Sequence, residues 1–487
     1  MAFDLILFGE LVLLGAMLVV LGRALLRPQR EPASRIAWMI AILVLPVLGI
    51  VAYLLVGEAR ISRRRSARYA AIEARLPRPD GDPEAAQVLA HGHFHAPFAL
   101  ARAVNGLPPT LFNQASLAAD SNAAIAGMVA DIDAAETSVH LCFYIWLADG
   151  NGLLLKDALI RAARRGIKVR VLADALGSRL FARSRHWQDL LDAGVDARLA
   201  LPVGGLVWTL IRGRVDLRNH RKLLICDNRV AWCGSQNAAD PEFRIKRRYA
   251  PWVDIMTRWE GPVARHQQFL FASDWMAEGG DDVTALLAPT AHRAPPAASA
   301  GGIAAQVIGT GPIQPFPAMT ACFAELIHAA RHELMITTPY FVPDEQLLFA
   351  LTSAARRGVK VVLVVPRRND SRIVAGASRS HYPALLDAGV QLHEFGPGLL
   401  HAKTMVADGL AGLIGSANLD RRSFELNFEN NLLFADAAFA AQVRARQDQR
   451  QDQWLALSSP VTPTTVAAYS VPRRLWQNLL AMWSPLL

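Results

Sequence analysis

One short pattern of residues occurs twice in this chain of 487 residues. The first copy spans His220–Asp227 and is followed by Gly234–Asn237, and the second spans His401–Asp408 and is followed by Gly415–Asn418. Each copy reads H-x-K-x4-D and then G-S-x-N, with the same spacing between the two parts. A pattern repeated in full predicts two homologous halves, and we expect equivalent residues from both halves to meet in one active site.

The residue types in this pattern suit chemistry on a phosphodiester. A neutral imidazole can attack phosphorus and form a covalent phospho-histidine, and a second imidazole can protonate the leaving oxygen and then deprotonate the incoming alcohol or water. Lysine ammonium groups and asparagine amides can stabilise charge on the non-bridging oxygens, so such a site needs no metal ion or cofactor. The residues that we expect to carry the reaction are His220, Lys222, Asp227, His401, Lys403 and Asp408, with Ser235, Asn237, Ser416 and Asn418 binding the phosphate.

Apolar residues around each pattern predict a buried strand. Residues i and i+2 of a strand point to the same face, so the histidine and lysine of each copy are expected to point together. Asp227 and Asp408 lie seven residues after their histidines, which puts them on the opposite face or in the following turn. We therefore interpret the two aspartates mainly as braces of the site.

The duplication extends beyond this pattern. Ala162–Val169 and Ala354–Val361 differ at one position, and Leu-Leu-Asp-Ala-Gly-Val occurs at 190–195 and again at 385–390. Both halves show the order helix, Arg-Arg-Gly turn, apolar strand, second helix and histidine strand. The first half has an insert, Val203–Asn219, which is rich in Trp, Leu and Arg. This order predicts α/β halves whose sheets are largely covered.

Two apolar runs near the N-terminus each reach the roughly 20 residues that cross a bilayer core. Leu5–Leu26 is apolar apart from Glu10 and Arg23, and Ile36–Val56 is apolar throughout and contains Pro46. A signal peptide is the alternative for the first run, but no basic residue precedes it and no clear small-x-small cleavage site follows it. We expect the two runs to form a transmembrane hairpin.

Charge indicates the partner and the orientation. The formal net charge is +9, and a basic protein beside a membrane hairpin is expected to meet acidic lipid rather than nucleic acid. The loop between the apolar runs carries Arg27, Arg30 and Arg35, with Arg23 at its edge, whereas five arginines lie between Arg60 and Arg68, a margin of one. The positive-inside rule favours the larger cluster in the cytoplasm, together with the catalytic part.

The paired patterns resemble the phospholipase D superfamily and, within it, the bacterial cardiolipin synthases. The resemblance covers nearly the whole chain, including the two apolar runs. It extends to Asp240-Pro241, Trp252–Asp254, Glu260–Val263, Thr337–Asp344 and Gly415–Glu429. The resemblance implies an α/β fold of two pseudo-symmetric phospholipase D-like halves that share one active site, preceded by the hairpin in a bacterial inner membrane.

The resemblance also implies roles for further residues. In the superfamily a carboxylate downstream of each pattern orients the histidine of the other pattern. Glu429 would then orient His220, and Asp254 would orient His401. The first histidine is the nucleophile in several relatives, so we expect His220 to attack phosphorus and His401 to act as acid and base.

The implied reaction transfers a phosphatidyl group from one phosphatidylglycerol to another, giving cardiolipin and glycerol. Phosphatidylglycerol and other anionic phospholipids are the expected partners, and nucleic acid is not. Hydrolysis by water, as in a phospholipase D, is the nearest alternative, and a membrane-tethered phosphodiesterase or endonuclease is a second. A non-catalytic lipid-binding scaffold is disfavoured because both patterns are complete.

The expected segments follow from these patterns. They are 1–57 (hairpin, with spans at about 5–26 and 36–56), 58–108 (basic linker), 109–285 (first half), 286–302 (linker), 303–460 (second half) and 461–487 (C-terminal amphipathic segment).

Three further features give less specific signals. His91, His93 and His95 are spaced like a metal cluster but have no carboxylate beside them. Arg244–Tyr249 could hold a lipid headgroup or form a solvated loop. Val471–Leu487 contains two Trp and several Leu, so it resembles an interfacial anchor, with packing on the catalytic part as the alternative.

Overall fold

The computed structural model describes residues 2–26, 32–57, 61–79, 89, 92–202, 216–288, 302–314, 317–448 and 453–482. The chain divides into an N-terminal unit, mainly Met1–Arg63, and a larger unit, mainly Arg64–Pro202 and Leu217–Pro485. Most of the predicted insert and most of the predicted linker at 286–302 lie outside the described residues.

The N-terminal unit contains three apolar helices, α1 (Ala2–Leu25), α2 (Pro32–Val44) and α3 (Pro46–Val56). Within α1, residues 6–25 are long and apolar enough to cross a membrane. The second expected span, by contrast, is divided at Pro46. Proline lacks an N–H and its ring clashes with the carbonyl four residues earlier, so the first helix ends at Val44. Each piece is shorter than a spanning helix needs to be, and the expected two-span hairpin is therefore only partly present.

The two pieces of the second run pack closely on each other. Trp38 of α2 and Tyr53 of α3 meet edge to face, with their ring centroids 5.4 Å apart. A side chain at Gly49 would lie 2.4 Å from the carbonyl oxygen of Ala41. The N-terminal unit thus has its own small apolar core, which also includes Val20 of α1.

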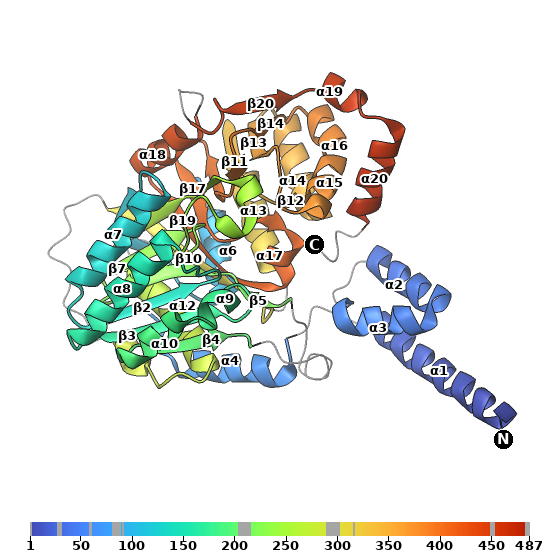
Figure 1. Cartoon of the computed structure of the whole chain (residues 1–487). Helices are drawn as coiled ribbons and strands as arrows, with labels where there is room; N and C mark the ends of the chain where they lie inside the picture. The colour runs from blue at the N-terminus through green and yellow to red at the C-terminus, as the bar shows by residue number, and fades with distance from the viewer. Residues whose placement is uncertain are drawn as a thin grey trace. The chain divides into compact units, whose positions relative to one another are not determined.

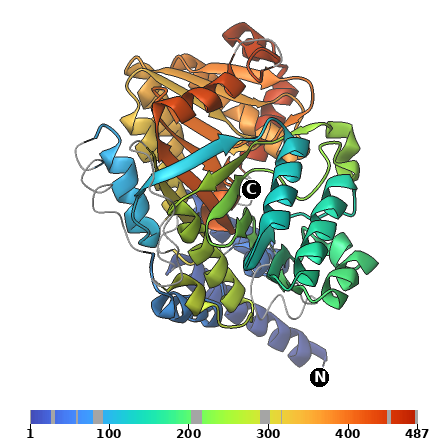
Figure 2. The ribbon, with the colours of Figure 1, turned by 90° about the vertical axis from the view of Figure 1, so that its left-hand side faces the viewer.

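The larger unit is built on one sheet to which both halves contribute (Figures 1 and 2). In the first half the strands run outward in the order β1-β9-β7-β6-β2-β3-β4, and in the second half in the order β10-β19-β17-β16-β11-β13-β14. The two series match strand for strand, and β1 pairs with β10 at the centre. This arrangement confirms the predicted pair of pseudo-symmetric α/β halves.

The bounds of these strands follow the duplicated sequence. The first half contains β1 (Thr110–Leu117), β2 (Ser138–Phe143), β3 (Lys168–Asp174), β4 (Asp196–Ala200), β6 (Lys222–Cys226), β7 (Val230–Gly234) and β9 (Met256–Glu260). The second contains β10 (Ile303–Thr310), β11 (Glu333–Thr337), β13 (Lys360–Pro366), β14 (Gln391–Phe395), β16 (Thr404–Ala407), β17 (Ala411–Gly415) and β19 (Asn427–Ala435), with β20 (Ser458–Val461) beside β14.

Helices cover the sheet at equivalent places in the two halves. In the first half these are α7 (Ser121–Ala134), α8 (Gly150–Arg164), α10 (Arg185–Asp192) and α12 (Val263–Ala277). In the second half they are α13 (Ala318–Ala329), α14 (Glu345–Arg356), α16 (Tyr382–Asp387) and α18 (Ala437–Gln447). Alternating apolar residues of the strands face these helices, and each half forms its own buried core.

The segment expected as a basic linker contains two helices, α4 (Arg63–Arg75) and α6 (His95–Asn105). Phe98 and Ala101 of α6 are buried in the core of the second half. On α4, Tyr69 and Ile72 lie three residues apart and are buried, while arginines occupy much of the outer surface. Helical spacing of a few apolar residues among many arginines thus folds this segment onto the larger unit.

Candidate active site

The two histidines of the repeated pattern follow short strands that pair with the opposite half. β5 (Arg218–Asn219) precedes His220 and pairs with β19 of the second half. β15 (Leu399–Leu400) precedes His401 and pairs with β8 (Trp252–Val253) of the first half. The backbone N–H of His220 then donates to the carbonyl of Phe428 at 2.9 Å, and that of His401 donates to the carbonyl of Val253 at 2.7 Å. Backbone pairing therefore positions each histidine against the other half.

This crossing places each imidazole on a buried carboxylate of the opposite half. Nδ1 of His220 lies 3.0 Å from both carboxylate oxygens of Glu429. Nδ1 of His401 lies 2.6 Å from Oδ1 of Asp254. These are the exchanged partners that the resemblance implies. A carboxylate at Nδ1 favours the tautomer that carries its proton there, which leaves Nε2 free for chemistry.

The electrostatics of the site favour neutral imidazoles beside ionised carboxylates. Burial lowers the pKa of His220 to about 4, although Glu429 acts to raise it. Burial also lowers the pKa of His401, against the effect of Asp254. Burial alone would raise the pKa of the two carboxyl groups, but the adjacent histidines and lysines outweigh it, and the pKa of Asp254 falls to about 2 while that of Glu429 also falls.

The two lysines occupy equivalent positions. The ammonium group of Lys222 donates to the carbonyl of His220 at 2.6 Å, and that of Lys403 donates to the carbonyl of His401 at 2.6 Å. Burial lowers the pKa of Lys222 to about 8 and that of Lys403 to about 7. The charge of each lysine also lowers the pKa of the other half's histidine. The four side chains are thus close enough to form one shared site.

The serines differ from their expected role in binding phosphate. The hydroxyl of Ser235 donates to Asp254 at 2.5 Å, and that of Ser416 donates to Glu429. Each hydroxyl oxygen in turn accepts a backbone N–H, from Ile255 at 3.0 Å and from Asn430 at 2.8 Å. Because a hydroxyl has a single proton, both serines orient the carboxylates that hold the histidines.

The asparagines of G-S-x-N remain available as phosphate ligands. The side-chain oxygen of Asn237 accepts the backbone N–H of Ile145 at 3.3 Å, which directs its NH2 group away from that contact. The side-chain oxygen of Asn418 is buried and has no hydrogen-bond partner in the part of the chain that the structure describes. An unpaired buried acceptor suits a group that donates a hydrogen bond, and only the NH2 group of this amide can donate to a phosphate oxygen.

The two aspartates of the pattern lie in the turns after β6 and β16, at the ends of these strands remote from the histidines. Asp227 accepts the backbone N–H groups of Glu136, Thr137 and Ser138 at 2.8–2.9 Å. Asp408 accepts the equivalent N–H groups before and at the start of β11, with distances of 2.7–2.9 Å. Burial acts to raise their pKa, but these donors hold the pKa of both carboxyl groups below its usual range. The geometry makes them braces between strands.

Sequence reasoning missed several aromatic and polar neighbours of the histidines. The ring of Tyr144 lies 4.9 Å from that of His220, and the ring of Trp252 lies 4.6 Å from that of His401. The side chain of Asn427 donates to Glu429 at 3.2 Å. The alternation of side chains along β19 could have indicated Asn427, which lies two residues before Glu429. No repeated pattern marks Tyr144.

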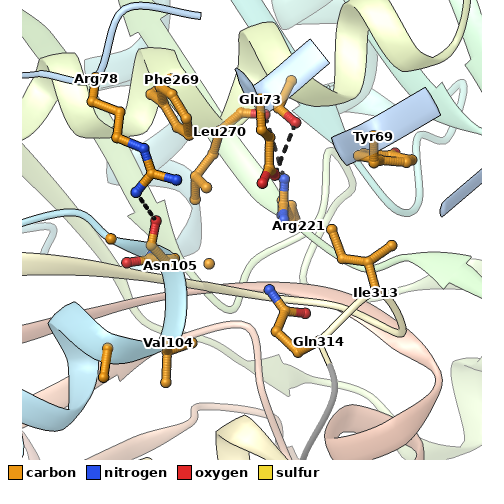
Figure 3. Close-up of a pocket in the computed structure, with 14 residues that line it drawn as sticks. Tyr69, Glu73, Arg78, Val104, Asn105, Arg221, Phe269, Leu270, Ile313 and Gln314 are labelled. Carbon is orange, nitrogen blue, oxygen red and sulfur yellow. Dashed lines mark hydrogen bonds between the residues drawn. The ribbon is translucent and has the colours of Figure 1, made fainter. Parts of the chain in front are cut away.

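A separate cavity of about 230 Å³ lies beside Arg221, the residue between His220 and Lys222. Arg221 forms a buried ion pair with Asp274 of α12 at 2.8 Å, and its Nε donates to the carbonyl of Glu429 at 3.2 Å. Figure 3 shows Arg221 near Glu73 of α4, on the wall of this cavity. Strand alternation directs Arg221 away from its histidine and lysine neighbours, so the cavity is distinct from the catalytic site.

The histidine cluster suggested as a metal site is only partly described. His91 lies outside the described residues, and His93 Nε2 lies 3.5 Å from a carboxylate oxygen of Asp408. Among the described residues, no three His, Cys, Asp or Glu side chains are grouped so as to hold a metal ion.

Comparison with known proteins agrees with this geometry. Residues 128–254 and 323–450 match the family described as "Cardiolipin synthase, PLD-like domain", and residues 14–58 match "Phospholipase_D-nuclease N-terminal". The chain is 36% identical over 480 residues to proteins named cardiolipin synthase A from Yersinia pseudotuberculosis serotype O:1b (strain IP 31758) and Yersinia pestis bv. Antiqua (strain Angola). Each match covers 97% of this chain and 97% of the relative.

A solved structure shares the fold. The chain is similar to the phosphatidylserine synthase of Haemophilus influenzae Rd KW20, with a TM-score of 0.58 and 15% sequence identity. The match covers 80% of this chain and 97% of that one.

Proposed function

The chain belongs to the family of cardiolipin synthases with phospholipase D-like domains, and we propose that it joins two phosphatidylglycerol molecules into cardiolipin and glycerol through a phospho-histidine. The observation that carries this proposal is the exchanged pairing of His220 with Glu429 and of His401 with Asp254. It supplies two buried imidazoles with free Nε2 atoms, as a two-step transfer requires.

In the first step, Nε2 of His220 attacks the phosphorus of one phosphatidylglycerol. The bond from phosphorus to the glycerol oxygen breaks, and that oxygen takes a proton from His401, so glycerol leaves. Burial lowers the pKa of His220 to about 4, so its ring is unprotonated at neutral pH as a nucleophile requires, and burial lowers the pKa of His401 as well. The anionic phosphodiester favours the protonated form of His401 that the departure of glycerol needs.

In the second step, neutral His401 removes the proton from a terminal hydroxyl of a second phosphatidylglycerol. The resulting oxygen attacks phosphorus, the bond to His220 breaks, and cardiolipin forms. Lys222 and Lys403, together with Asn237 and Asn418, stabilise the charge on the non-bridging oxygens in both transition states. Water in place of the second lipid would give phosphatidic acid by the same route.

We propose the bacterial inner membrane as the location, with the larger unit on the cytoplasmic side. The length and composition of α1 support attachment to a bilayer, and the net charge of +9 favours a surface rich in anionic phospholipid. Protease accessibility of the larger unit in sealed inverted vesicles tests this side, because protection there contradicts it.

The products formed from phosphatidylglycerol vesicles test the reaction. Purified full-length protein is expected to release cardiolipin and glycerol in equal amounts, and to retain phosphorus label from the headgroup phosphate on His220 after rapid denaturation at alkaline pH, where a phospho-histidine is stable. Phosphatidic acid alone would identify a hydrolase, and cleavage of DNA or RNA without lipid turnover would identify a nuclease. Label on His401 instead would reverse the assigned roles of the two histidines.

A further inference from the structure

The C-terminal helix α20 (Val471–Ala481) has an exposed apolar side. Its large apolar side chains, and that of the residue after it, have high exposed fractions: Val471 67%, Leu475 66%, Trp476 59%, Leu479 48% and Met482 76%. At 3.6 residues per turn, these five side chains fall within roughly 140° of the helix circumference. The helix therefore presents a continuous apolar stripe to its surroundings.

The opposite side of α20 fixes the orientation of this stripe. Gln477 and Leu480 are buried, and α20 packs along α15 (Arg372–Ser380). A side chain at Gly376 of α15 would lie 2.3 Å from Leu480, so glycine allows the two helices to approach closely. Since one face of α20 packs on α15, the apolar stripe on its other face points outward.

The helix that carries α20 also forms part of the catalytic surroundings. Tyr340, whose ring centroid lies 6.4 Å from that of His401, packs against Val374 and Ala377 of α15. The hydroxyl of Tyr340 donates to Asp370 at 2.8 Å, just before α15 begins. α20 and α15 thus connect the apolar stripe to the aromatic residue next to His401.

Further exposed apolar residues lie on α15 itself and on two elements that contact Asp370 or Tyr144 through a side chain. Ile373 is the second residue of α15, and Ile245 belongs to the 3-10 helix Arg244–Tyr249, whose Lys246 pairs with Asp370. Leu180 belongs to α9 (Arg179–Ala182), which follows Ser178, and Ser178 donates to the carbonyl of Tyr144 at 3.0 Å. The exposed fractions of these three side chains are 45%, 53% and 58%.

We propose that the stripe on α20, together with Ile373, Ile245 and Leu180, is a membrane-contact surface that lies in the interfacial region of an anionic bilayer beside the catalytic site. Water solvates such a surface poorly, whereas the boundary between headgroups and acyl chains accommodates Leu and Met below and Trp at the polar level. Arg474 on the flank of the stripe and the net charge of +9 favour phosphatidylglycerol over neutral lipid.

This surface bears on how a lipid substrate reaches the histidines. The proposed membrane contact rests on the proposed function only in taking phosphatidylglycerol as the substrate. Contact with a bilayer can be measured without turnover. A site whose surroundings lie in the interface receives lipids from the plane of the membrane, so it avoids lifting acyl chains through water.

Fluorescence of Trp476 tests the contact directly. The full chain in vesicles of phosphatidylglycerol and phosphatidylcholine is compared with Trp476→Phe, and the difference emission belongs to Trp476. We expect that emission to be blue-shifted and to fall at least about twofold when the acyl chains are brominated. As a matched control, Leu410→Trp in the Trp476→Phe background moves the indole to the exposed turn after β16, where quenching is not expected.

An activity measurement separates membrane contact from catalysis. The double variant Leu475→Glu/Leu479→Glu is expected to lose about tenfold in turnover of vesicle phosphatidylglycerol while keeping its turnover of a dispersed short-chain analogue within about twofold. Leu410→Glu adds one negative charge, half that of the double variant, at a remote exposed leucine and is expected to change neither rate.

Three results would overturn the inference: unquenched Trp476 emission, equal losses on both substrate forms, or a double variant that changes from dimer to monomer by sedimentation with Trp476 unquenched. The last result would identify the stripe as a contact between copies of the chain. A wild-type protein that turns over neither form of phosphatidylglycerol but shows quenched Trp476 would contradict the proposed function and leave the membrane contact supported.

Discussion

Tyr69 of α4 stacks on Phe428 of β19, with ring centroids 5.1 Å apart and the ring planes at 22°. The carbonyl of Phe428 accepts the backbone N–H of His220, and the next residue, Glu429, holds the His220 imidazole. The helix that follows the N-terminal unit therefore contacts the strand that positions the proposed nucleophile.

Truncation of this aromatic contact is expected to weaken the fold and to disturb the site. Tyr69→Ala removes a fully buried ring and should lower the free energy of unfolding by about 3–5 kcal/mol. Tyr69→Phe keeps the stacking and loses only a 3.4 Å contact from the hydroxyl to Asp274, so a loss of about 1 kcal/mol is expected. Urea unfolding measures both. Equal losses in the two variants would show that the hydroxyl, and not the stack, is the stabilising group.

Removal of either orienting carboxylate should impair the histidine of the opposite half. Glu429→Gln and Asp254→Asn keep the side-chain volume but no longer favour the tautomer with its proton on Nδ1, so kcat is expected to fall by about 100-fold or more. Steady-state kinetics on phosphatidylglycerol measures this effect. Asp420→Asn changes another buried carboxyl group that is not bonded to either histidine, and it should cost far less.

The two serines should affect kcat and not KM. Ser235→Ala and Ser416→Ala each remove the proton that the orienting carboxylate accepts, and a loss of about 10- to 100-fold in kcat is expected. Asn237→Ala, which removes a proposed phosphate ligand, should raise KM as well as lower kcat. A serine variant whose main effect is a raised KM would instead support the original prediction that the hydroxyl binds the phosphate.

The activity should depend on pH through the histidines and lysines. His220, with a pKa of about 4, loses its nucleophilic form only as the pH falls towards that value, so the acid limb of kcat/KM should lie well below the usual histidine range. Lys403 and Lys222, with pKa values of about 7 and about 8, lose their charges as the pH rises through those values. An alkaline limb is therefore expected in that window for the free enzyme.

Arginine at position 403 distinguishes the source of the alkaline limb. Lys403→Arg keeps its charge at high pH, so whatever rate it retains should show that limb at higher pH. Lys156→Arg, which changes a lysine paired with Asp157 and Asp189 outside the site, serves as the matched control. An unchanged limb in Lys403→Arg would assign the titration to a different group.

The aspartates of the repeated pattern should matter for stability more than for chemistry. Asp227→Ala leaves three backbone N–H groups without their acceptor, which is expected to lower the free energy of unfolding by about 1–3 kcal/mol. The kcat of the folded fraction should stay within about threefold of wild type, because the carboxylate lies at the end of β6 remote from His220. Thermal unfolding with parallel kinetics checks this pair of outcomes. A large loss of kcat at unchanged stability would place Asp227 in the reaction itself.

The duplicated sequence predicts the symmetric sheet because each half repeats both its motif and its flanking helices. The break at Pro46 is harder to foresee, since counting apolar residues measures their transfer to lipid and not the continuity of a helix. The helix α4 in 58–108 was hidden by its arginines, because only a few buried residues, such as Tyr69 and Ile72, anchor it.

In the active site, spacing shows which residues share a face but not which acceptor a side chain reaches. The predicted strands begin later than expected, since His220 precedes β6 and both His401 and Lys403 lie between β15 and β16. The serines face carboxylates located 13 and 19 residues further along the chain, a relationship set by the paired strands β7–β9 and β17–β19. Tyr144 and Trp252 come from segments with no repeated signature, so only the folded chain brings them to the histidines.

The central ladder between β1 and β10 restricts how this molecule can work. Backbone hydrogen bonds between β1 and β10 hold the two halves together. A hinge motion that opened the site between the halves for each lipid would have to break these bonds. The freed glycerol and the incoming acceptor therefore exchange at a site whose two halves stay joined. Initial-rate kinetics should consequently be ping-pong, with glycerol leaving before the second phosphatidylglycerol binds.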